Sequence, residues 1–256
     1  MISAERRERI KTILLERKSI TVAEMAQLFE VSTETIRRDF EALSDEGFLV
    51  KSYGGATLAM RKNTIVSQRV KSGIMTDVKK EMAGIAVSCI KPNDCIFLDH
   101  STTVFEMCEA LADMPLTVMT NSLSVMNRFC DCPNIRLISP GGNFDVVSQA
   151  FFGLEAVGYL NRHCVDKAFL SCKTLDLKRG MNDADEMVAE LRKSIVENSD
   201  YTYLLADHTK FGKTAFVQTC TLDRIDALIT NRPLPEEWSL QMEEDHVEVM
   251  ITDDQR

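Results

Sequence analysis

The sequence predicts an α/β protein in two parts, a small head and a larger body that is built on a mostly parallel sheet. The chain has 256 residues, of which 45% are hydrophobic, enough for one small and one medium-sized core. Residues 1–58 show three helical segments followed by a β-hairpin pattern, whereas residues 77–256 alternate apolar runs with helical segments. The polar, weakly periodic residues 59–76 are expected to link the two parts.

Composition and charge are typical of a cytoplasmic protein. No window approaches the roughly 18 apolar residues of a membrane helix, and the charged N-terminus lacks the apolar core of a signal peptide. The eight cysteines show neither a pairing rhythm nor metal-ligand spacing, so we expect reduced thiols and no metal or other cofactor. The net charge of −9 is concentrated in the body, because residues 1–62 hold 11 Lys and Arg against 10 Asp and Glu, and residues 63–256 hold 19 against 29. A near-neutral head on an acidic body suits a protein whose head approaches DNA.

The head begins with three helices in succession. Residues 3–17 place apolar side chains at helical spacing. Thr21 and Glu24 form a capping box that predicts the start of a second helix. Ser32 is a suitable N-cap for a third helix, which is expected to stop at Gly47.

The third helix separates a buried face from a charged one. Ile36, Phe40 and Leu43 form an apolar stripe, and Arg37 and Arg38 point away from it. Three hydroxyl residues lie at the N-terminal end of this helix: Ser32, Thr33 and Thr35. Arginine can bind phosphate or a guanine edge with two hydrogen bonds, and hydroxyls can bind phosphate oxygens, so the helix suits a DNA groove.

A solvated charged face, which would also carry Glu34, Asp39 and Glu41, explains this helix equally well when the helix is taken alone. The residues that follow favour DNA. Residues 47–58 form a strand, a turn at Gly-Gly and a second strand, which is the pattern of a wing. Lys51 and Tyr53 would then lie beside the minor groove or the backbone. The combination predicts a winged helix-turn-helix that binds double-stranded operator DNA.

The body alternates strands with helices. We expect strands at residues 95–98, 116–120, 135–139, 167–171, 201–206, 225–229 and 246–251, and helices from residues 77, 102 and 123 and over 184–197. Such alternation predicts a mostly parallel sheet covered on its faces, and in such sheets ligands bind beyond the carboxyl ends of the strands.

Polar or glycine residues follow four of these strands. They are Asp99, His100, Ser101, Thr102 and Thr103 after the first, Asn121 and Ser122 after the second, Gly141 and Gly142 after the third, and Lys210 after the strand at 201–206. Hydroxyls and amides at a helix start favour an anion, and a lysine supplies a charge for phosphate. Each junction alone has an ordinary capping or turn explanation, but together they predict a site for an anionic effector.

Two sets of segments resemble the DeoR family of bacterial repressors. VSTETIRRDFEALSDEGFLVKSYGGATL resembles the family's DNA-binding signature, and LDHSTTVFEM, LTVMTNSLSV, ISPGGNF, VDKAFLSCKTLD and LLADHTKFGKTA resemble its sensor domain. The resemblance implies a body similar in fold to ribose-5-phosphate isomerase and CoA transferases. It also implies that the effector is a phosphorylated sugar or polyol, that the Ser-Thr-Thr loop holds the phosphate, and that Asp99, Asn121, Glu186 and Lys210 line the pocket.

One block departs from the family pattern. Ser171-Cys172-Lys173-Thr174 stands where the family commonly has a stretch similar to Gly-Ala-Asp-Gly. Isomerase relatives need acidic residues there for proton transfer, so isomerase activity is not expected. Lys173 adds a cation near the predicted pocket, which suggests an effector with more negative charge, such as a bisphosphate or a phosphorylated sugar acid. A lysine that points to solvent explains the residue equally well.

Three functions fit these observations. The first is a repressor of a carbohydrate operon, controlled by its effector, in which a homodimer or homotetramer places two recognition helices about 34 Å apart in successive major grooves. The second is a sugar-phosphate isomerase-like enzyme with a DNA-binding head, which the altered block argues against. The third is a constitutive DNA-binding protein whose body only oligomerises. Stabilisation by a sugar phosphate would distinguish the first function from the third. We therefore expect a regulator without enzymatic activity.

Overall fold

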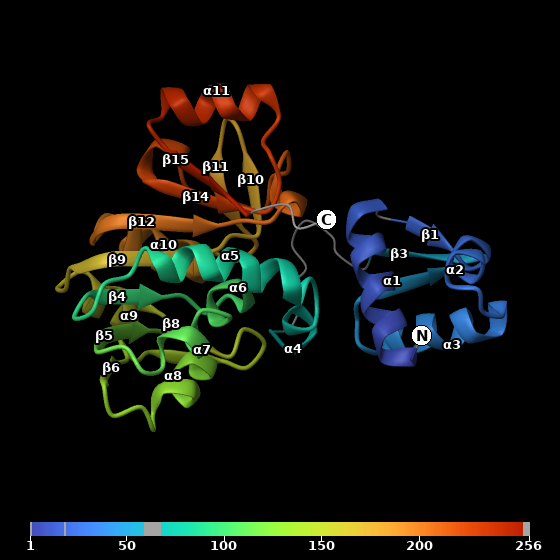
Figure 1. Cartoon of the computed structure of the whole chain (residues 1–256), viewed down its shortest axis with the longest axis horizontal. Helices are drawn as coiled ribbons and strands as arrows, with labels where there is room; N and C mark the ends of the chain where they lie inside the picture. Colours follow the sequence, from blue (N-terminus) through green and yellow to red (C-terminus); the bar gives the residue numbers. More distant parts are fainter. Residues whose placement is uncertain (1, 18, 59–67, 253–256) are drawn as a thin grey trace. The chain divides into compact units, whose positions relative to one another are not determined.

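A computed structural model describes residues 2–17, 19–58 and 68–252 of the chain (Figure 1). The chain divides into two compact units, residues 1–76 and 77–256. The first half of the predicted linker, residues 59–67, lies outside the described residues. Within the described ranges, no helix has the length and hydropathy that a membrane span requires.

The first unit contains the predicted helix-turn-helix. Its helices are α1 (Ser3–Arg17), α2 (Val22–Phe29) and α3 (Thr33–Asp45), and its strands are β1 (Ser19–Thr21), β2 (Leu49–Ser52) and β3 (Gly55–Leu58). Both predicted caps are present, because the Thr21 hydroxyl accepts a hydrogen bond from the Glu24 amide and the Ser32 hydroxyl accepts one from the Thr35 amide. The helices bury a common apolar core that includes Ile10, Met25 and Phe40.

Strand β1 was not predicted. It pairs with β3 and completes a three-stranded antiparallel sheet in the order β1-β3-β2. A Cβ atom at Gly55 would lie 2.4 Å from the carbonyl oxygen of Ile20, so only glycine lets the two strands approach this closely. The strand has three residues, and its last residue, Thr21, also caps α2, which left no periodic pattern in the sequence.

The second half of the predicted linker is structured. Helix α4 (Gln68–Ser72) lies in the first unit, and Ile74 is buried in that unit's core. An isolated isoleucine in a polar segment carries no periodicity, so its burial could not be predicted.

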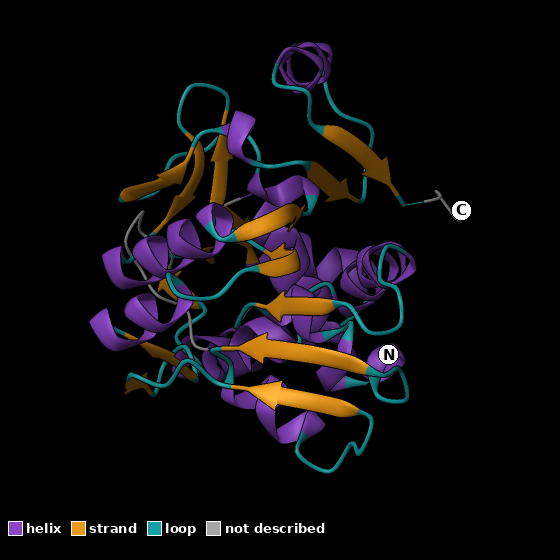
Figure 2. Ribbon diagram, turned by 90° about the vertical axis from the view of Figure 1, so that its left-hand side faces the viewer, coloured by secondary structure: helices purple, strands orange, loops and turns teal. Residues whose placement is uncertain are grey.

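The second unit is built on a seven-stranded, wholly parallel sheet in the order β15-β14-β12-β9-β4-β5-β6 (Figure 2). Its strands are β4 (Cys95–Leu98), β5 (Leu116–Thr120), β6 (Ile135–Ile138), β9 (Val165–Leu170), β12 (Ser199–Leu205), β14 (Ala227–Thr230) and β15 (Glu248–Ile251). Each matches a strand predicted from an apolar run. The predicted α/β class with a parallel sheet is therefore confirmed.

Helices cover both faces of this sheet. One face carries α5 (Thr76–Ser88), α6 (Thr102–Phe105), α7 (Cys108–Leu111) and α8 (Leu123–Phe129), and the other carries α9 (Leu154–Leu160), α10 (Glu186–Glu197) and α11 (Glu236–Glu244). The neighbouring residues Phe97 and Leu98 are fully buried in different cores. Burial on both faces explains why the strands appear in the sequence as continuous apolar runs.

Two small antiparallel sheets were not predicted. One is the hairpin of β7 (Asn143–Asp145) and β8 (Ala150–Phe152), and the other joins β10 (Thr174–Asp176), β11 (Gly180–Asp183) and β13 (Val217–Cys220). These strands have three or four residues and mix polar with apolar side chains. They extend the structure beyond the carboxyl ends of the large sheet, where the effector site was predicted.

Candidate DNA-reading helix and effector site

The N-terminal end of α3 presents the predicted hydroxyl residues. Ser32 and Thr33 are exposed, and Thr35 is half-buried. The hydroxyls of Ser32 and Thr35 lie 2.9 Å apart, and the Ser32 hydroxyl accepts a hydrogen bond from the Thr35 amide at 3.1 Å. The cap therefore orients both hydroxyls at the start of the helix.

Arg37 and Arg38 leave the apolar stripe as predicted, with side chains 65% and 80% exposed. Both are within ion-pair distance of Glu34, at 3.5 Å for Arg37 and 3.9 Å for Arg38. In the wing, Lys51 pairs with Glu41 at 3.0 Å, and Tyr53 is fully exposed at the turn. The three cations of this surface are thus each paired with a glutamate of α3.

Asp39 does not lie on the solvated face that the sequence suggested. Its side chain is buried, and it accepts hydrogen bonds from Arg6 at 2.6 Å and from Ser3 at 3.3 Å. The partners are on α1, 33 and 36 positions away, so no local pattern revealed the pair. With Asp39 buried, the exposed face of α3 is less acidic than the charged-surface interpretation required.

In the body, the strand order brings the predicted effector segments together. Strands β6, β5, β4, β9 and β12 are successive neighbours and run parallel, so their carboxyl ends lie at one edge of the sheet. The segments after them contain, in that order, Gly141 and Gly142, then Asn121 and Ser122, then Asp99 to Thr103, then Lys173, and finally Lys210. Glu186 is exposed at the first turn of α10.

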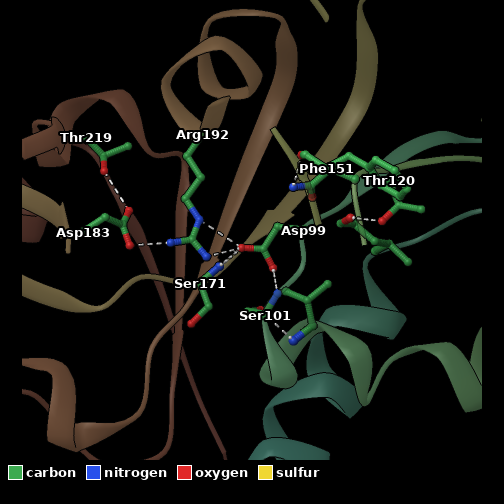
Figure 3. A network of polar contacts seen from close by, with 11 residues as sticks. Asp99, Ser101, Thr120, Phe151, Ser171, Asp183, Arg192 and Thr219 are labelled. Atoms are coloured by element: carbon green, nitrogen blue, oxygen red, sulfur yellow. Dashed lines mark hydrogen bonds and ion pairs between the residues drawn. The ribbon is translucent and has the colours of Figure 1, made fainter. Parts of the chain in front are cut away.

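Asp99 lies at the centre of a buried charge network (Figure 3). One carboxylate oxygen accepts a hydrogen bond from the Ser101 amide at 2.8 Å, and the other accepts bonds from the Ser171 amide at 3.1 Å and from Arg192 at 2.6 Å. Arg192 also binds Asp183 at 2.5 Å, and Asp183 accepts a hydrogen bond from the Thr219 hydroxyl. Both oxygens of Asp99 are therefore occupied by protein groups.

Asp99 and Arg192 both remain charged in this network. Burial alone would raise the pKa of Asp99, but Arg192, His100 and the hydrogen bonds from Ser101 hold it below its ordinary value. Burial would lower the pKa of Arg192, but Asp183 and Asp99 raise it above its ordinary value. The ends of β4 and β9 are thus joined to α10 by an ion pair that persists at neutral pH.

Sequence reasoning missed Arg192 and Asp183. Ala189, Arg192 and Ile195 recur every three residues on α10, and all three are buried. An arginine on the apolar stripe of a predicted helix is a signal that it neutralises a buried carboxylate. That signal was present in the sequence.

The hydroxyl and amide groups near Asp99 are ordered by local bonds. Ser101 caps α6 by accepting from the Val104 amide at 3.2 Å, and Thr102 and Thr103 are buried in the first turn. His100 is buried, and its ring meets that of Phe152 edge-on at 5.2 Å.

The end of β5 contributes a buried amide to the same edge. The Thr120 hydroxyl donates to the Leu98 carbonyl at 2.7 Å and accepts from the Ser122 amide at 3.0 Å, which ties the ends of β4 and β5 together. The Asn121 side chain donates to the Phe151 carbonyl at 3.2 Å. Its own oxygen is buried and has no hydrogen-bond partner within the described ranges. Such an atom offers an acceptor to a ligand hydroxyl.

The opposite side of this edge is cationic. Lys210 ends a short 3₁₀ turn and stabilises the negative charge of Asp207. Burial alone would raise the pKa of Asp207, but Lys210 and the hydrogen bonds from Thr209 hold it below its ordinary value. Lys173 is half-buried, and its pKa is lowered first by burial and then by Lys210. The positive charge of Lys210 thus disfavours a positive charge on Lys173, and a bound anion would relieve this repulsion.

Comparison with known proteins assigns both units. The sequence model of the DeoR-like helix-turn-helix domain matches residues 6–62, and that of the DeoR C terminal sensor domain matches residues 74–232. The HTH-type transcriptional regulator YulB of Bacillus subtilis, itself uncharacterized, is 39% identical over 236 residues, which cover 91% of each chain.

The names of two further relatives say whether they activate or repress transcription. The L-fucose operon activator of Haemophilus influenzae is 31% identical over 84% of this chain and 87% of its own. The transcriptional repressor GlcR of Bacillus subtilis is 28% identical over 99% of this chain and 98% of its own. Among solved structures, ribose 5-phosphate isomerase A of Methanocaldococcus jannaschii is 16% identical, with a TM-score of 0.39 over 53% of this chain and 54% of the isomerase.

Proposed function

The chain belongs to the DeoR family of DNA-binding transcriptional regulators, and from this premise we propose that it represses a carbohydrate operon under the control of a phosphorylated sugar or polyol. The observation that carries the proposal is the convergence of Ser101, Thr103, Asn121 and Lys210 at one edge of the parallel sheet. The relative named for the L-fucose operon supports the carbohydrate link. The relative named as a repressor supports repression, whereas the L-fucose relative is named as an activator. The protein is a regulator rather than an isomerase, since these relatives are regulators of transcription.

In this proposal α3 lies in the major groove, with two copies of the chain contacting successive grooves. Arg37 and Arg38 contact base edges or phosphates, and the Ser32, Thr33 and Thr35 hydroxyls bind phosphate oxygens. Lys51 and Tyr53 contact the adjacent minor groove or backbone. The ion pairs of Glu34 with both arginines must then break when DNA binds. Glu34 therefore lowers the affinity for DNA that is bound through charge alone.

Glu34→Gln is therefore expected to tighten binding to generic duplex DNA. Exposed ion pairs contribute about 0.2–1 kcal/mol each, so the loss of both pairs should raise the affinity about two- to thirtyfold at low salt. The slope of log affinity against log salt should become steeper by about one unit. Fluorescence anisotropy with a random-sequence duplex measures both quantities. Glu197→Gln, the same change at an exposed position of α10, is the matched control, and an equal response from both variants would refute the role of Glu34.

For the effector, we propose that the anion binds between the Ser101–Thr103 turn and Lys210. The unpartnered oxygen of Asn121 accepts a hydrogen bond from a sugar hydroxyl, and the bare backbone at Gly141 and Gly142 lies beside the ligand. Because both oxygens of Asp99 are occupied, Asp99 is a positioning residue that holds the Ser101 turn. His100, Thr102 and Ser122 shape the same turn and its neighbour, and Glu186 is proposed at the rim of the site.

A thermal-shift screen of phosphorylated sugars and polyols tests this function. A ligand that binds only the folded state raises the melting temperature, by an amount equivalent to about 2.7 kcal/mol at a hundred times its dissociation constant. Lys210→Met is expected to remove most of that shift, whereas Lys178→Met, which removes an exposed lysine, should leave it unchanged. If every compound leaves the wild-type melting temperature unchanged, the body is not a sugar-phosphate sensor.

The same screen decides the role of Lys173. If its ammonium group faces the ligand, Lys173→Ala should weaken stabilisation by bisphosphates and phosphorylated sugar acids more than stabilisation by monophosphates. An unchanged response to every ligand would end the hypothesis of a more highly charged effector.

A further inference from the structure

An exposed apolar surface lies on the β7–β8 hairpin and the start of α9. It consists of Phe144, Val146, Val147 and Leu154, which are 41%, 71%, 41% and 86% exposed and are called the hairpin patch below. Half of the large hydrophobic residues that are exposed in the described part of the body therefore fall within eleven positions of the sequence. Single exposed hydrophobic residues are common, but a cluster indicates an interaction surface.

The hairpin presents this patch beside an open strand edge. The rings of Phe144 and Phe151 pack across the two strands at 5.1 Å. Gly153 lies against the side chain of Asn143, which brings Leu154 next to the base of β7. Among the described residues, β7 pairs with β8 on one side and with no strand on the other. An open edge with exposed apolar side chains is a template for pairing with another strand.

The charge distribution favours a second copy of this chain as the partner. Residues 63–256 hold 19 Lys and Arg against 29 Asp and Glu, a net charge of −10, so two bodies repel each other over most of their surfaces. Residues 139–154 contain a single charged residue, Asp145, and its carboxylate already accepts hydrogen bonds from the Val147 and Ser148 amides within the turn. The hairpin is therefore a place where two acidic bodies can meet with little repulsion.

We propose that the hairpin patch is an interface between two copies of this chain, in which β7 of one copy pairs antiparallel with β7 of the other. Such an arrangement is self-complementary about a two-fold axis. It rests on the proposed function in one respect, namely that a regulator with one reading helix per chain requires two chains to contact successive grooves.

The position of the hairpin also joins this interface to the effector site. The Phe151 amide donates to the Asn121 carbonyl at 2.9 Å, the Asn121 side chain donates to the Phe151 carbonyl, and the Leu123 amide donates to the Gln149 carbonyl at 3.0 Å. The ring of Phe152 contacts His100. A ligand that displaces Asn121 or His100 must therefore displace an element of the interface.

Sedimentation of the full-length protein over a concentration series tests the interface without DNA or effector. Leu154→Lys places like charges on both sides of the two-fold axis, and such a juxtaposition should raise the dissociation constant about a hundredfold or more, so that the mass of the assembly halves. Leu240→Lys is the matched control, because Leu240 is also an exposed leucine, at 60%, on α11. Val146→Lys should reproduce the effect of Leu154→Lys.

Hydrogen exchange provides a second readout that does not depend on variants. The amides of residues 143–147 should exchange more slowly above the dissociation constant than below it. A wild-type chain that is monomeric at every concentration, a Leu154→Lys chain that assembles like the wild type, or a Leu240→Lys chain that dissociates equally would each overturn the interface. Since no sugar phosphate takes part, failure of the thermal-shift screen leaves this result unaffected, and the two proposals fail separately.

Discussion

Replacement of Arg192 with Met is expected to lower the free energy of unfolding by about 3–5 kcal/mol at neutral pH, because it leaves two buried carboxylates without their cation. Arg192 is 4% exposed and binds both Asp99 and Asp183, which are 0% and 3% exposed. Methionine fills a similar volume but cannot neutralise them. Since native domains are stable by only about 5–15 kcal/mol, this single change removes a large share of the total.

The deficit should depend on pH in a defined direction. Without Arg192, burial raises the folded-state pKa of the Asp99 carboxyl group above its unfolded value. A carboxyl group with a raised folded pKa destabilises the protein above its unfolded pKa, and the penalty is relieved as the pH falls through the folded pKa. In the wild type, the lowered pKa of Asp99 keeps that group charged and stabilising in the same range. The difference between variant and wild type should therefore shrink from pH 7 to about pH 5.

Urea unfolding of the full chain at the two pH values measures both effects. Lys193→Met removes the neighbouring, exposed cation of α10 and should change the stability by no more than about 0.5 kcal/mol. Adding Asp99→Asn and Asp183→Asn to Arg192→Met removes the unpaired charges and should recover part of the loss. A deficit that is constant with pH would mean that packing, and not charge, accounts for the role of Arg192.

The second large effect is expected in DNA binding. The double variant Arg37→Ala/Arg38→Ala should bind its target about thirtyfold or more weakly, since each arginine contact to DNA contributes about 1–3 kcal/mol. The dependence on salt should also fall by about two units, because two fewer phosphate counterions are released. The probe is a duplex enriched from a random pool by the wild-type protein, and anisotropy titrations at several salt concentrations measure the affinity and the slope.

The control for this experiment is Arg162→Ala/Arg179→Ala, which removes two exposed arginines from the body. It should leave the affinity for the enriched duplex unchanged. Stabilisation by a sugar phosphate should be the same in wild type and in Arg37→Ala/Arg38→Ala, because those arginines belong to the first unit. A simultaneous loss of DNA binding and of ligand stabilisation would contradict the division of labour between the two units.

The elements that sequence reasoning predicted are those with local signals. The capping residues Thr21 and Ser32 predict the starts of their helices. The strands of the large sheet are predicted by apolar runs, because these strands are buried on both faces. The hairpin at residues 143–152 and the strands around Asp183 were missed, because they are short, partly polar and stabilised by pairing with distant segments.

The location of the candidate site could be predicted from the sequence, but its ion pairs could not. A general rule for parallel sheets locates the segments of Ser101, Asn121 and Lys210, because it depends only on where strands end. What Asp99 does there depends on Arg192, which is 93 positions away, and the environment of Asp39 depends on Arg6 in another helix. Long-range ion pairs of this kind leave only a charged residue on an apolar stripe as their trace in the sequence.

The buried pair of Arg6 and Asp39 has a thermodynamic consequence for recognition. It fastens α3 to α1 from the side opposite the exposed arginines, so the orientation of α3 is set before any partner arrives. The ordering entropy of this helix is then lost during folding and not during association. Calorimetry of complex formation should accordingly lack the large negative heat-capacity change of a segment that folds as it binds.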